Sequence, residues 1–264
     1  MIILDGKKTS NDIKAEIAES VKEIVANGSR PPHLAAVIVG DDGASLTYVS
    51  SKVRACKMVG FESTLIKLPE SISENDLLEK VNDLNNDENI DGYIVQLPLP
   101  KHIDSQKILM AVDADKDVDG FHPTNFGKLF MGNPKFIPCT PLGCLYMLKH
   151  EIEDIKGKNA VIIGRSNIVG KPMASLLLSS NCSVTITHSR TKNIQEHTRK
   201  ADILIVAVGI PEMIDEKFIK PGVVVIDVGI NRLESKTKDN NKGVLVGDVK
   251  FEKVLKIAKK ITPV

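Results

Sequence analysis

The residues most suited to chemistry in the first half of the chain are Tyr48 and Lys52, in the segment SLTYVSSK. They are four positions apart, so on a helix both project from one face and can act on one bound molecule. A lysine in a desolvated cleft can exchange protons near neutral pH, which suits the activation of water. A surface lysine beside a half-buried tyrosine gives the same spacing, and it is the commoner outcome for an isolated pair.

Gln96 and the aspartates Asp117 and Asp119 are further candidates. Gln96 ends an apolar run, where its amide can donate to and accept from a bound heterocycle or a neighbouring ammonium. The aspartates stand two apart in the glycine-bounded segment DVDG. Carboxylates in such loops usually accept hydrogen bonds from the turn or from a ligand. No histidine cluster accompanies them, so we predict no metal site.

Gly164 and Gly170 indicate a phosphate-binding turn between the apolar run 159–163 and a helical pattern over 171–180. A dinucleotide needs a turn with no side chain blocking its pyrophosphate, followed by a helix start whose free N–H groups favour negative charge. The spacing is G-x5-G and not G-x-G-x-x-G. The motif is therefore weak by itself, and an ordinary strand-to-helix turn is the alternative, but the strand–turn–helix context favours a cofactor site.

The residues after the next apolar run favour NADP over NAD. NAD-binding folds of this kind place an acidic residue about 20 positions past the glycine turn, where it binds the ribose 2′-hydroxyl. The corresponding stretch here, residues 187–191, is THSRT and contains no acid. Arg165, Ser189 and Arg190 supply donors for a 2′-phosphate instead. We assign no chemistry to His188 in the same stretch.

The elements that must position these residues alternate between helix and strand. Helical periodicity covers about 8–26, 44–59 and 73–85, and β-branched apolar runs cover 34–39, 63–68 and 92–96. The sequence LPLP at 97–100 cannot continue a ladder of hydrogen bonds. The end of the run 92–96 is therefore exposed at the carboxyl edge of a parallel sheet, where open α/β sheets bind ligands.

A second α/β unit follows the Gly- and Pro-rich stretch 117–141, which has no sustained periodicity and is typical of a connection. A helix near 141–150 precedes the glycine turn, and three further strands are predicted at 183–187, 203–208 and 223–228. We therefore predict a two-domain α/β fold. Residues 1–120 form a parallel-sheet α/β domain, and residues 121–264 form a Rossmann-like NADP-binding domain.

The composition excludes several functional classes. The 35 basic and 34 acidic residues leave a net charge of +1, which provides no field to attract nucleic acid. No run approaches the ~18 apolar residues of a membrane span, and the first residues lack the apolar core of a secretory signal. The four cysteines are too scattered for a zinc site or a disulfide framework. We expect a cytoplasmic or matrix protein with a small-molecule partner.

Six blocks occur in order along the chain: YVSSK at 48–52, VQLPLP at 95–100, KDVDG at 116–120, IPCTP at 137–141, GRSNIVGKP at 164–172 and ITPV at 261–264. Together they closely resemble the bifunctional methylenetetrahydrofolate dehydrogenase/methenyltetrahydrofolate cyclohydrolase family over nearly the whole chain. The resemblance implies oxidation of 5,10-methylenetetrahydrofolate with NADP⁺, then hydrolysis of the methenyl product to 10-formyltetrahydrofolate. It also implies one active-site cleft between two domains, a homodimer, and a place in one-carbon metabolism and purine biosynthesis.

The resemblance implies roles for residues on both sides of the reaction. Lys52 would be the catalytic residue, Tyr48 would stack against the folate, and Gln96 would position and tune Lys52. Asp119 would bind the pterin. The further substrate contacts that it implies are Val95 and Leu97. The NADP site that it implies is lined by Gly164, Arg165, Ser166, Ser189 and Ile230.

The family normally continues past ITPV with a Pro-Gly-Gly-Val-Gly-Pro segment that contacts folate and a last helix that packs back onto the first domain. Neither lies within the 264 residues. If the native chain stops at Val264, we expect weaker folate binding, and an intact mass of the expressed protein would test this. Two other functions stay open: a member that keeps one of the two activities, and an NADP-binding regulatory protein without chemistry. The second is disfavoured by the presence of Tyr48, Lys52, Gln96 and Asp119.

Overall fold

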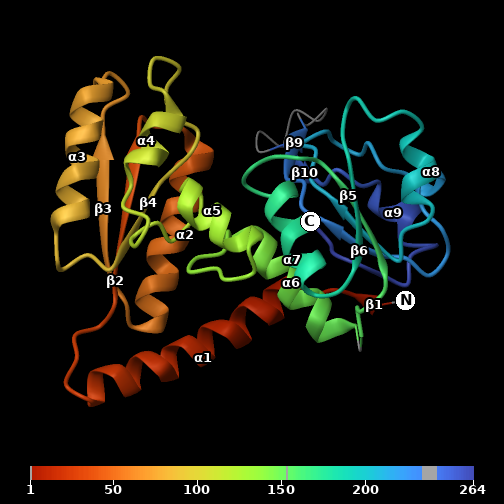
Figure 1. Ribbon diagram of the computed structural model, residues 1–264, viewed down its shortest axis with the longest axis horizontal. Coiled ribbons are helices and arrows are strands. Elements are labelled where there is room, and N and C mark those ends of the chain that lie inside the picture. The colour runs from red at the N-terminus through yellow and green to blue at the C-terminus, as the bar shows by residue number, and fades with distance from the viewer. Residues whose placement is uncertain (1, 153, 234–242) are drawn as a thin grey trace. The chain divides into compact units, whose positions relative to one another are not determined.

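The computed structural model describes residues 2–152, 154–233 and 243–264. The chain folds into two compact α/β units, as predicted (Figure 1). One unit is Lys7–Ile137, and the other combines the N-terminal segment up to Gly6 with Pro138–Val264. In the part of the chain that the structure describes, no helix is long and apolar enough to cross a membrane.

The first unit contains a parallel three-stranded sheet in the order β3-β2-β4. The helical ranges expected from periodicity are confirmed within a few residues. The elements of this unit are α1 (Gly6–Ala26), β2 (His33–Val39), α2 (Gly43–Val59), β3 (Glu62–Leu68), α3 (Glu74–Asn86), β4 (Gly92–Val95), α4 (Ser105–Ala111) and α5 (Pro123–Phe130).

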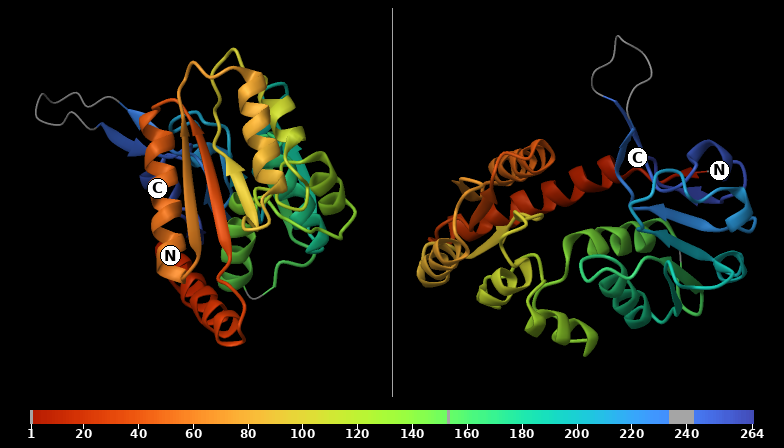
Figure 2. Two further views of the ribbon diagram at one scale, coloured as in Figure 1. Left: turned by 90° about the vertical axis from the view of Figure 1, so that its left-hand side faces the viewer. Right: turned by 90° about the horizontal axis from the view of Figure 1, so that it is seen from above.

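Alternate residues of the central strand β2 serve the two faces of this sheet. Ala35, Val37 and Val39 pack in one cluster with side chains of α3, α4 and β4. Ala36 and Ile38 pack in a second cluster with α2. Since successive side chains of a strand point to opposite faces, α2 and α3 must cover opposite sides of the sheet, as Figure 2 shows in its left view.

The stretch 117–141, expected to be an irregular connection, contains the helix α5. The prediction was wrong there because eight residues are too few to show a helical period, whereas local interactions form the helix: His122 Nδ1 accepts the Thr124 N–H, and Pro123 occupies the first turn. Asn125 fastens this helix to the preceding loop through Asp117. The contacts accordingly divide the chain between Ile137 and Pro138, whereas we expected the boundary after residue 120.

The second unit is built on a parallel six-stranded sheet in the order β1-β11-β8-β7-β5-β6. An antiparallel hairpin, β9–β10, stands apart from that sheet. The elements are β1 (Ile2–Ile3), α6 (Cys139–Glu151), β5 (Asn159–Ile163), α7 (Gly170–Ser179), β6 (Ser183–Thr187), α8 (Ile194–Thr198), β7 (Ile203–Val206), η1 (Glu216–Phe218), β8 (Val224–Asp227), β9 (Asn231–Leu233), β10 (Val244–Val246), α9 (Phe251–Val254) and β11 (Lys260–Ile261).

The strand order explains where this unit can hold a ligand. β5 has β6 on one side and β7 on the other, so the chain reverses its direction of winding at β5. Ligands of open α/β sheets bind outside the carboxyl ends of the strands at such a switch point. The glycine turn predicted for the cofactor directly follows β5, which confirms the Rossmann-like arrangement expected for this unit.

Candidate active site and cofactor turn

Helix α2 carries Tyr48 and Lys52 beside a buried apolar stripe. Val49 is buried and Val53 packs with it against the sheet, in a cluster that also contains Ile94 of β4. Tyr48 is 56% exposed and Lys52 is half-buried. The packing of Val49 and Val53 therefore fixes the helix face on which Tyr48 and Lys52 stand one turn apart.

Gln96 directly follows β4 and extends its pairing with β2. Its N–H donates to the Val37 carbonyl at 2.9 Å, so the ladder continues one residue past the strand. Because Ile94 faces α2, the two-residue period places the Gln96 side chain on the same face. The amide Nε2 donates to the Leu97 carbonyl at 2.8 Å, and the amide Oε1 is buried without a hydrogen-bond partner among the described residues. That oxygen can accept a bond from an ammonium or a ligand.

A short segment alongside β4 brings Asp119 to the same region. Tyr93 donates its N–H to the Lys116 carbonyl at 3.0 Å, and Tyr93 and Asp117 form a parallel bridge. Gly92 has to be glycine because a Cβ there would lie 2.3 Å from Val118 Cγ1. Val118 joins the apolar cluster under α2, and Asp119 follows it. One cluster thus positions the three segments that carry Lys52, Gln96 and Asp119.

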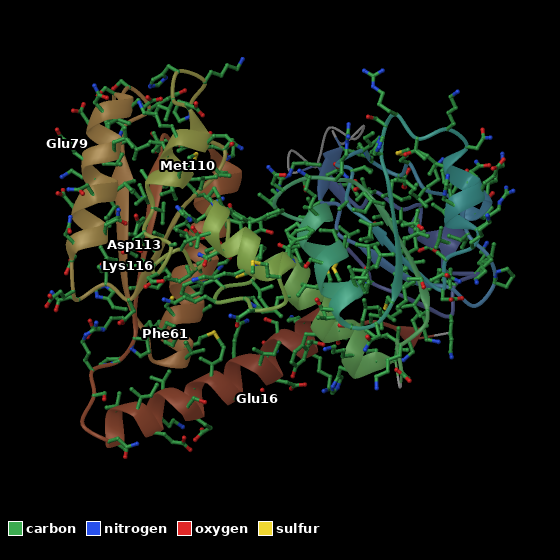
Figure 3. All side chains as sticks on the ribbon, viewed as in Figure 1. Glu16, Phe61, Glu79, Met110, Asp113 and Lys116 are labelled. Carbon is green, nitrogen blue, oxygen red and sulfur yellow. The ribbon has the colours of Figure 1, made fainter. Side chains whose placement is uncertain are left out.

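The segment that precedes Asp117 is anchored to the end of α3. Asp113 and Lys116 lie side by side on it (Figure 3), and the Lys116 N–H donates to the Asp113 carbonyl at 2.9 Å. The Lys116 ammonium donates to the carbonyls of Leu84 and Asp87, at 3.0 and 2.7 Å. A cation at these carbonyls also complements the negative end of the helix dipole. Asp119 is therefore held by a fixed segment and not by a free loop.

Asp117 and Asp119 have different surroundings. Asp117 is buried, and its Oδ2 accepts the His122 N–H at 2.8 Å and the Asn125 amide at 2.9 Å, so it organises the turn. Asp119 is half-buried and accepts no hydrogen bond from a residue that the structure describes. Burial raises the pKa of the Asp119 carboxyl, and the charge of Lys52 opposes that rise. Of the two aspartates, Asp119 is the one free to receive a ligand.

The turn after β5 depends on its two glycines. Gly164 has φ +123°, and a Cβ there would lie 2.2 Å from the Ala207 carbonyl oxygen. At Gly170 a Cβ would lie 2.3 Å from the Gly164 carbonyl oxygen. Backbone fills the space where side chains would stand, as a close-packed dinucleotide turn requires. The geometry of the turn therefore fits a nicotinamide dinucleotide.

Ser166 lies within this turn at the start of α7. Its Oγ accepts the N–H groups of Val169 at 3.1 Å and Gly170 at 3.3 Å. A hydroxyl that accepts these bonds still has its own proton to donate, for example to a phosphate. Arg165 and Ser166 are both exposed, and α7 offers the positive end of its dipole there.

The loop after β6 is a tight turn built around His188. The His188 N–H donates to Thr191 Oγ1 at 2.9 Å, and its Nδ1 accepts the Arg190 N–H at 3.1 Å. Ser189 and Arg190 are exposed at the tip. His188 thus organises the turn through these two hydrogen bonds, and the loop presents donors without an acid.

Ile230 follows β8 and is 62% exposed, as a residue available to a ligand would be. Sequence reasoning missed two carboxylates near the same edge of the sheet, the half-buried Asp227 and the fully buried Asp248. Both accept hydrogen bonds from loop N–H groups at the carboxyl edge of the sheet. The local signal for them was an aspartate at the end of an apolar run, directly after it in VVVIDVG and one glycine later in VLVGDV.

Comparison with known proteins agrees with both halves of this description. A family model for the tetrahydrofolate dehydrogenase/cyclohydrolase catalytic domain matches residues 4–119, and a model for the NAD(P)-binding domain of the same family matches residues 138–264. The bifunctional protein FolD of Flavobacterium johnsoniae is 57% identical over 270 residues, which cover 100% of this chain and 90% of that protein.

Solved structures of relatives have the same fold. The bifunctional FolD methylenetetrahydrofolate dehydrogenase/cyclohydrolase of Campylobacter jejuni is 47% identical, with a TM-score of 0.94 over 100% of this chain and 91% of that one. The Trypanosoma brucei enzyme, solved with NADP and an inhibitor, is 35% identical, with a TM-score of 0.94 over 100% of this chain and 90% of that one. This chain therefore belongs to the tetrahydrofolate dehydrogenase/cyclohydrolase family.

Proposed function

We propose that the chain oxidises 5,10-methylenetetrahydrofolate to 5,10-methenyltetrahydrofolate with NADP⁺, and hydrolyses the methenyl compound to 10-formyltetrahydrofolate. The observation that carries the proposal is the grouping of Lys52, Gln96 and Asp119 around one apolar cluster, in a chain that matches both domains of the family. Among the described residues, none donates a hydrogen bond to Gln96 Oε1 or to the Asp119 carboxylate, and none accepts one from the Lys52 ammonium. In this proposal the unit Lys7–Ile137 serves the folate, and the unit that contains Pro138–Val264 serves the cofactor.

Lys52 is the proposed catalytic residue of the hydrolysis. Water adds to the electrophilic methenyl carbon, and the Lys52 amine takes up the proton that the water loses. The hydroxyl of the adduct then loses its proton as the bond from that carbon to N5 breaks, N5 receives a proton, and the formyl group stays on N10, so that one proton is released overall. The unpartnered Gln96 Oε1 can accept a hydrogen bond from the lysine and so hold it in place.

The remaining folate contacts follow from exposure and charge. Tyr48 presents a largely exposed ring for stacking against the folate. The Asp119 carboxylate can accept hydrogen bonds from the ring N–H and amino groups of the pterin. Val95 and Leu97 flank Gln96 at the carboxyl end of β4 and complete the proposed substrate contacts.

NADP⁺, when bound, accepts the hydride, and the protein contributes mainly placement. We assign the pyrophosphate to the turn at Gly164 and Ser166 and to the N-terminus of α7. Arg165 and Ser189 would bind the 2′-phosphate, which NAD lacks. Ile230 would contact the cofactor from the loop after β8.

The proposal extends to a cytoplasmic homodimer that works in one-carbon metabolism and purine biosynthesis, without nucleic acid as a partner. The hairpin β9–β10 supports the dimer, because among the described residues its two strands pair with no third strand, and they expose Leu233, Val244 and Leu245. Exposed apolar side chains on a hairpin are suited to association with another chain. Light scattering across a dilution series would detect the dimer, and a monomer mass at all concentrations would contradict it.

A spectrophotometric assay tests the catalytic proposal. The protein is given 5,10-methylenetetrahydrofolate with NADP⁺ or NAD⁺, and formation and decay of the methenyl compound are followed. We expect the methenyl compound to form when NADP⁺ is present. When methenyltetrahydrofolate itself is supplied, we expect it to decay with either nicotinamide. Formation without decay, or decay without formation, would show a member with one activity. Cofactor binding without any turnover would overturn the proposal.

A further inference from the structure

Asp248 joins the loops that follow β7 and β8. It is fully buried, and its Oδ2 accepts the N–H groups of Val208 at 2.7 Å and Gly209 at 2.9 Å. Its Oδ1 accepts the side-chain amide of Asn231 at 2.9 Å. One carboxylate therefore binds the backbone of the loop after β7 and the side chain of the residue at which the loop after β8 ends and β9 begins.

Two glycines make room for this carboxylate network. A Cβ at Gly229 would lie 2.3 Å from Asp248 Oδ1, and a Cβ at Gly247 would lie 1.8 Å from Asp227 Oδ2. Asp227 in turn accepts the N–H groups of Gly229 at 2.9 Å and Asp248 at 3.1 Å. The loop after β8 thus lies directly on the Asp248 carboxylate, and Asp227 holds the backbone of Asp248 in register.

The loop after β7 also contacts the cofactor turn. The carbonyl oxygen of Ala207 occupies the space where a Cβ of Gly164 would stand. Val208 and Gly209, the next two residues, are the backbone donors to Asp248. A continuous run of contacts therefore leads from Asp248 through the loop after β7 to the turn proposed for the pyrophosphate.

The position of these loops indicates which half of the cofactor they serve. In a doubly wound sheet the pyrophosphate crosses at the switch point and the ribose of the adenosine half lies at the end of the second strand, here β6. The nicotinamide half must then lie on the other side of β5, over β7 and β8. The loops that Asp248 joins follow those two strands.

We propose that Asp248 is a positioning residue for hydride transfer, which fixes the loops after β7 and β8 so that the nicotinamide half of NADP is held in its reactive position. This inference rests on the proposed dehydrogenase function. Asp248 acts through Val208, Gly209 and Asn231 and need not touch the cofactor. Its loss should therefore impair hydride transfer much more than the hydrolysis, which uses no cofactor.

The test compares Asp248→Ala with the unchanged protein in four measurements. We expect the dehydrogenase kcat to fall about 100-fold, the loss that a displacement of about 1 Å can cause. Hydrolysis of supplied methenyltetrahydrofolate, measured without cofactor, should stay within about threefold, and binding of 2′,5′-ADP, a probe of the adenosine half, within about twofold. Titration of NADPH by its fluorescence should show weaker binding.

Asp248→Asn separates positioning from negative charge. Its amide oxygen can still accept the Val208 and Gly209 N–H groups, and its NH₂ group can face a flipped Asn231 amide. We expect it to restore most of the dehydrogenase rate. Asp202→Ala is the matched control, because Asp202 accepts the Asn159 N–H at 2.9 Å and pairs with Lys220 at 2.7 Å at the opposite edge of the same sheet. It should lower the Tm without separating the two activities.

The outcomes decide the inference in every case. If Asp248→Ala lowers both activities together and Asp248→Asn does no better, Asp248 serves folding alone and the proposal is wrong. If Asp248→Ala does not fold, Asn231→Ala takes its place: a selective loss of dehydrogenase activity supports the proposal, and an equal effect on both activities refutes it. If the unchanged protein shows no turnover, the proposed function is wrong. If the unchanged protein turns over normally and the variants show no selective loss of dehydrogenase activity, only the inference about Asp248 is wrong.

Discussion

Burial raises the pKa of the Asp119 carboxyl, and the ammonium of Lys52 opposes that rise. No hydrogen bond joins the two groups. Lys52 therefore affects the pKa of Asp119 through the Coulombic attraction between two charges in the same α/β unit. Each side chain keeps its donors or acceptors available for a ligand. A residue proposed for proton transfer and one proposed to bind the pterin are thus coupled electrostatically before any substrate is present.

Lys52→Met should abolish cyclohydrolase activity while part of the dehydrogenase activity remains. Hydrolysis requires a proton acceptor for the attacking water, and loss of such a group costs about 10²- to 10⁴-fold in rate. Hydride transfer depends mainly on placement, which methionine preserves in part because of its similar length. Lys57→Met, at an exposed position on the same helix, is the control and should leave both rates unchanged. Equal retention of both activities in Lys52→Met would refute the assignment.

Asp119→Asn should stabilise the fold at neutral pH. The pKa of Asp119 is raised in the folded state, so its ionisation opposes folding. That cost is absent below the unfolded pKa of about 3.9 and is complete above the raised folded pKa. The variant should therefore have the higher Tm at pH 7, and its advantage should shrink as the pH falls toward 4. A lower Tm at pH 7 would show that the Lys52 interaction outweighs burial.

The same variant should bind folate poorly. A hydrogen bond to a charged group contributes about 1.5–3 kcal/mol, so the folate KM should rise roughly 10- to 100-fold. Asp41→Asn, at an exposed position on the loop after β2, is the control for the same change of side chain at a site outside the proposed folate contacts, and it should leave the folate KM unchanged. An unchanged folate KM in Asp119→Asn would remove Asp119 from the pterin site.

Gly164→Ala should weaken NADPH binding and lower stability together. The new methyl group would lie 2.2 Å from the Ala207 carbonyl oxygen, at a φ of +123° that alanine rarely adopts. The loop after β7 would have to move, and the turn with it. Gly157→Ala separates strain from collision, because Gly157 has φ +69° with open space around it and should cost only about 1–2 kcal/mol of stability. Wild-type NADPH affinity in Gly164→Ala, measured by fluorescence titration, would contradict the proposed cofactor turn.

The parts of the fold that were predictable are those with a local signal. The strands β2 and β5 are runs of consecutive apolar residues, and α1 to α3 show a clear helical period, so their ranges followed from the sequence. The pairing of β1 with β11 did not, because each strand has two residues and the partners lie at opposite ends of the chain. Nothing in either dipeptide indicates the other.

The same distinction applies to the candidate site. Lys52 and the glycine turn stand in local patterns that can be read within a few residues of the sequence. Asp248 was missed because its role depends on hydrogen-bond partners that are distant in the sequence. These are two backbone N–H groups about 40 positions earlier and a side-chain amide 17 positions earlier. Asn125 was missed for a similar reason, since its role is the buried hydrogen bond that it donates to Asp117. Supporting residues of this kind become visible only when distant segments meet.

Arg165→Gln should reduce the preference for NADP over NAD. A guanidinium that contacts a 2′-phosphate makes charge-assisted hydrogen bonds worth about 1.5–3 kcal/mol, so the KM for NADP⁺ should rise roughly 10- to 100-fold. NAD⁺ has no 2′-phosphate, so its kcat/KM should change little, and Ser189→Ala should act in the same direction more weakly. Lys256→Gln, at an exposed position in the same unit, is the control for the loss of one positive charge. If Arg165→Gln lowers kcat/KM equally for both nicotinamides, Arg165 contacts the part of the cofactor that they share. The preference for NADP would then depend on Ser189 and Arg190, which would bind the 2′-phosphate.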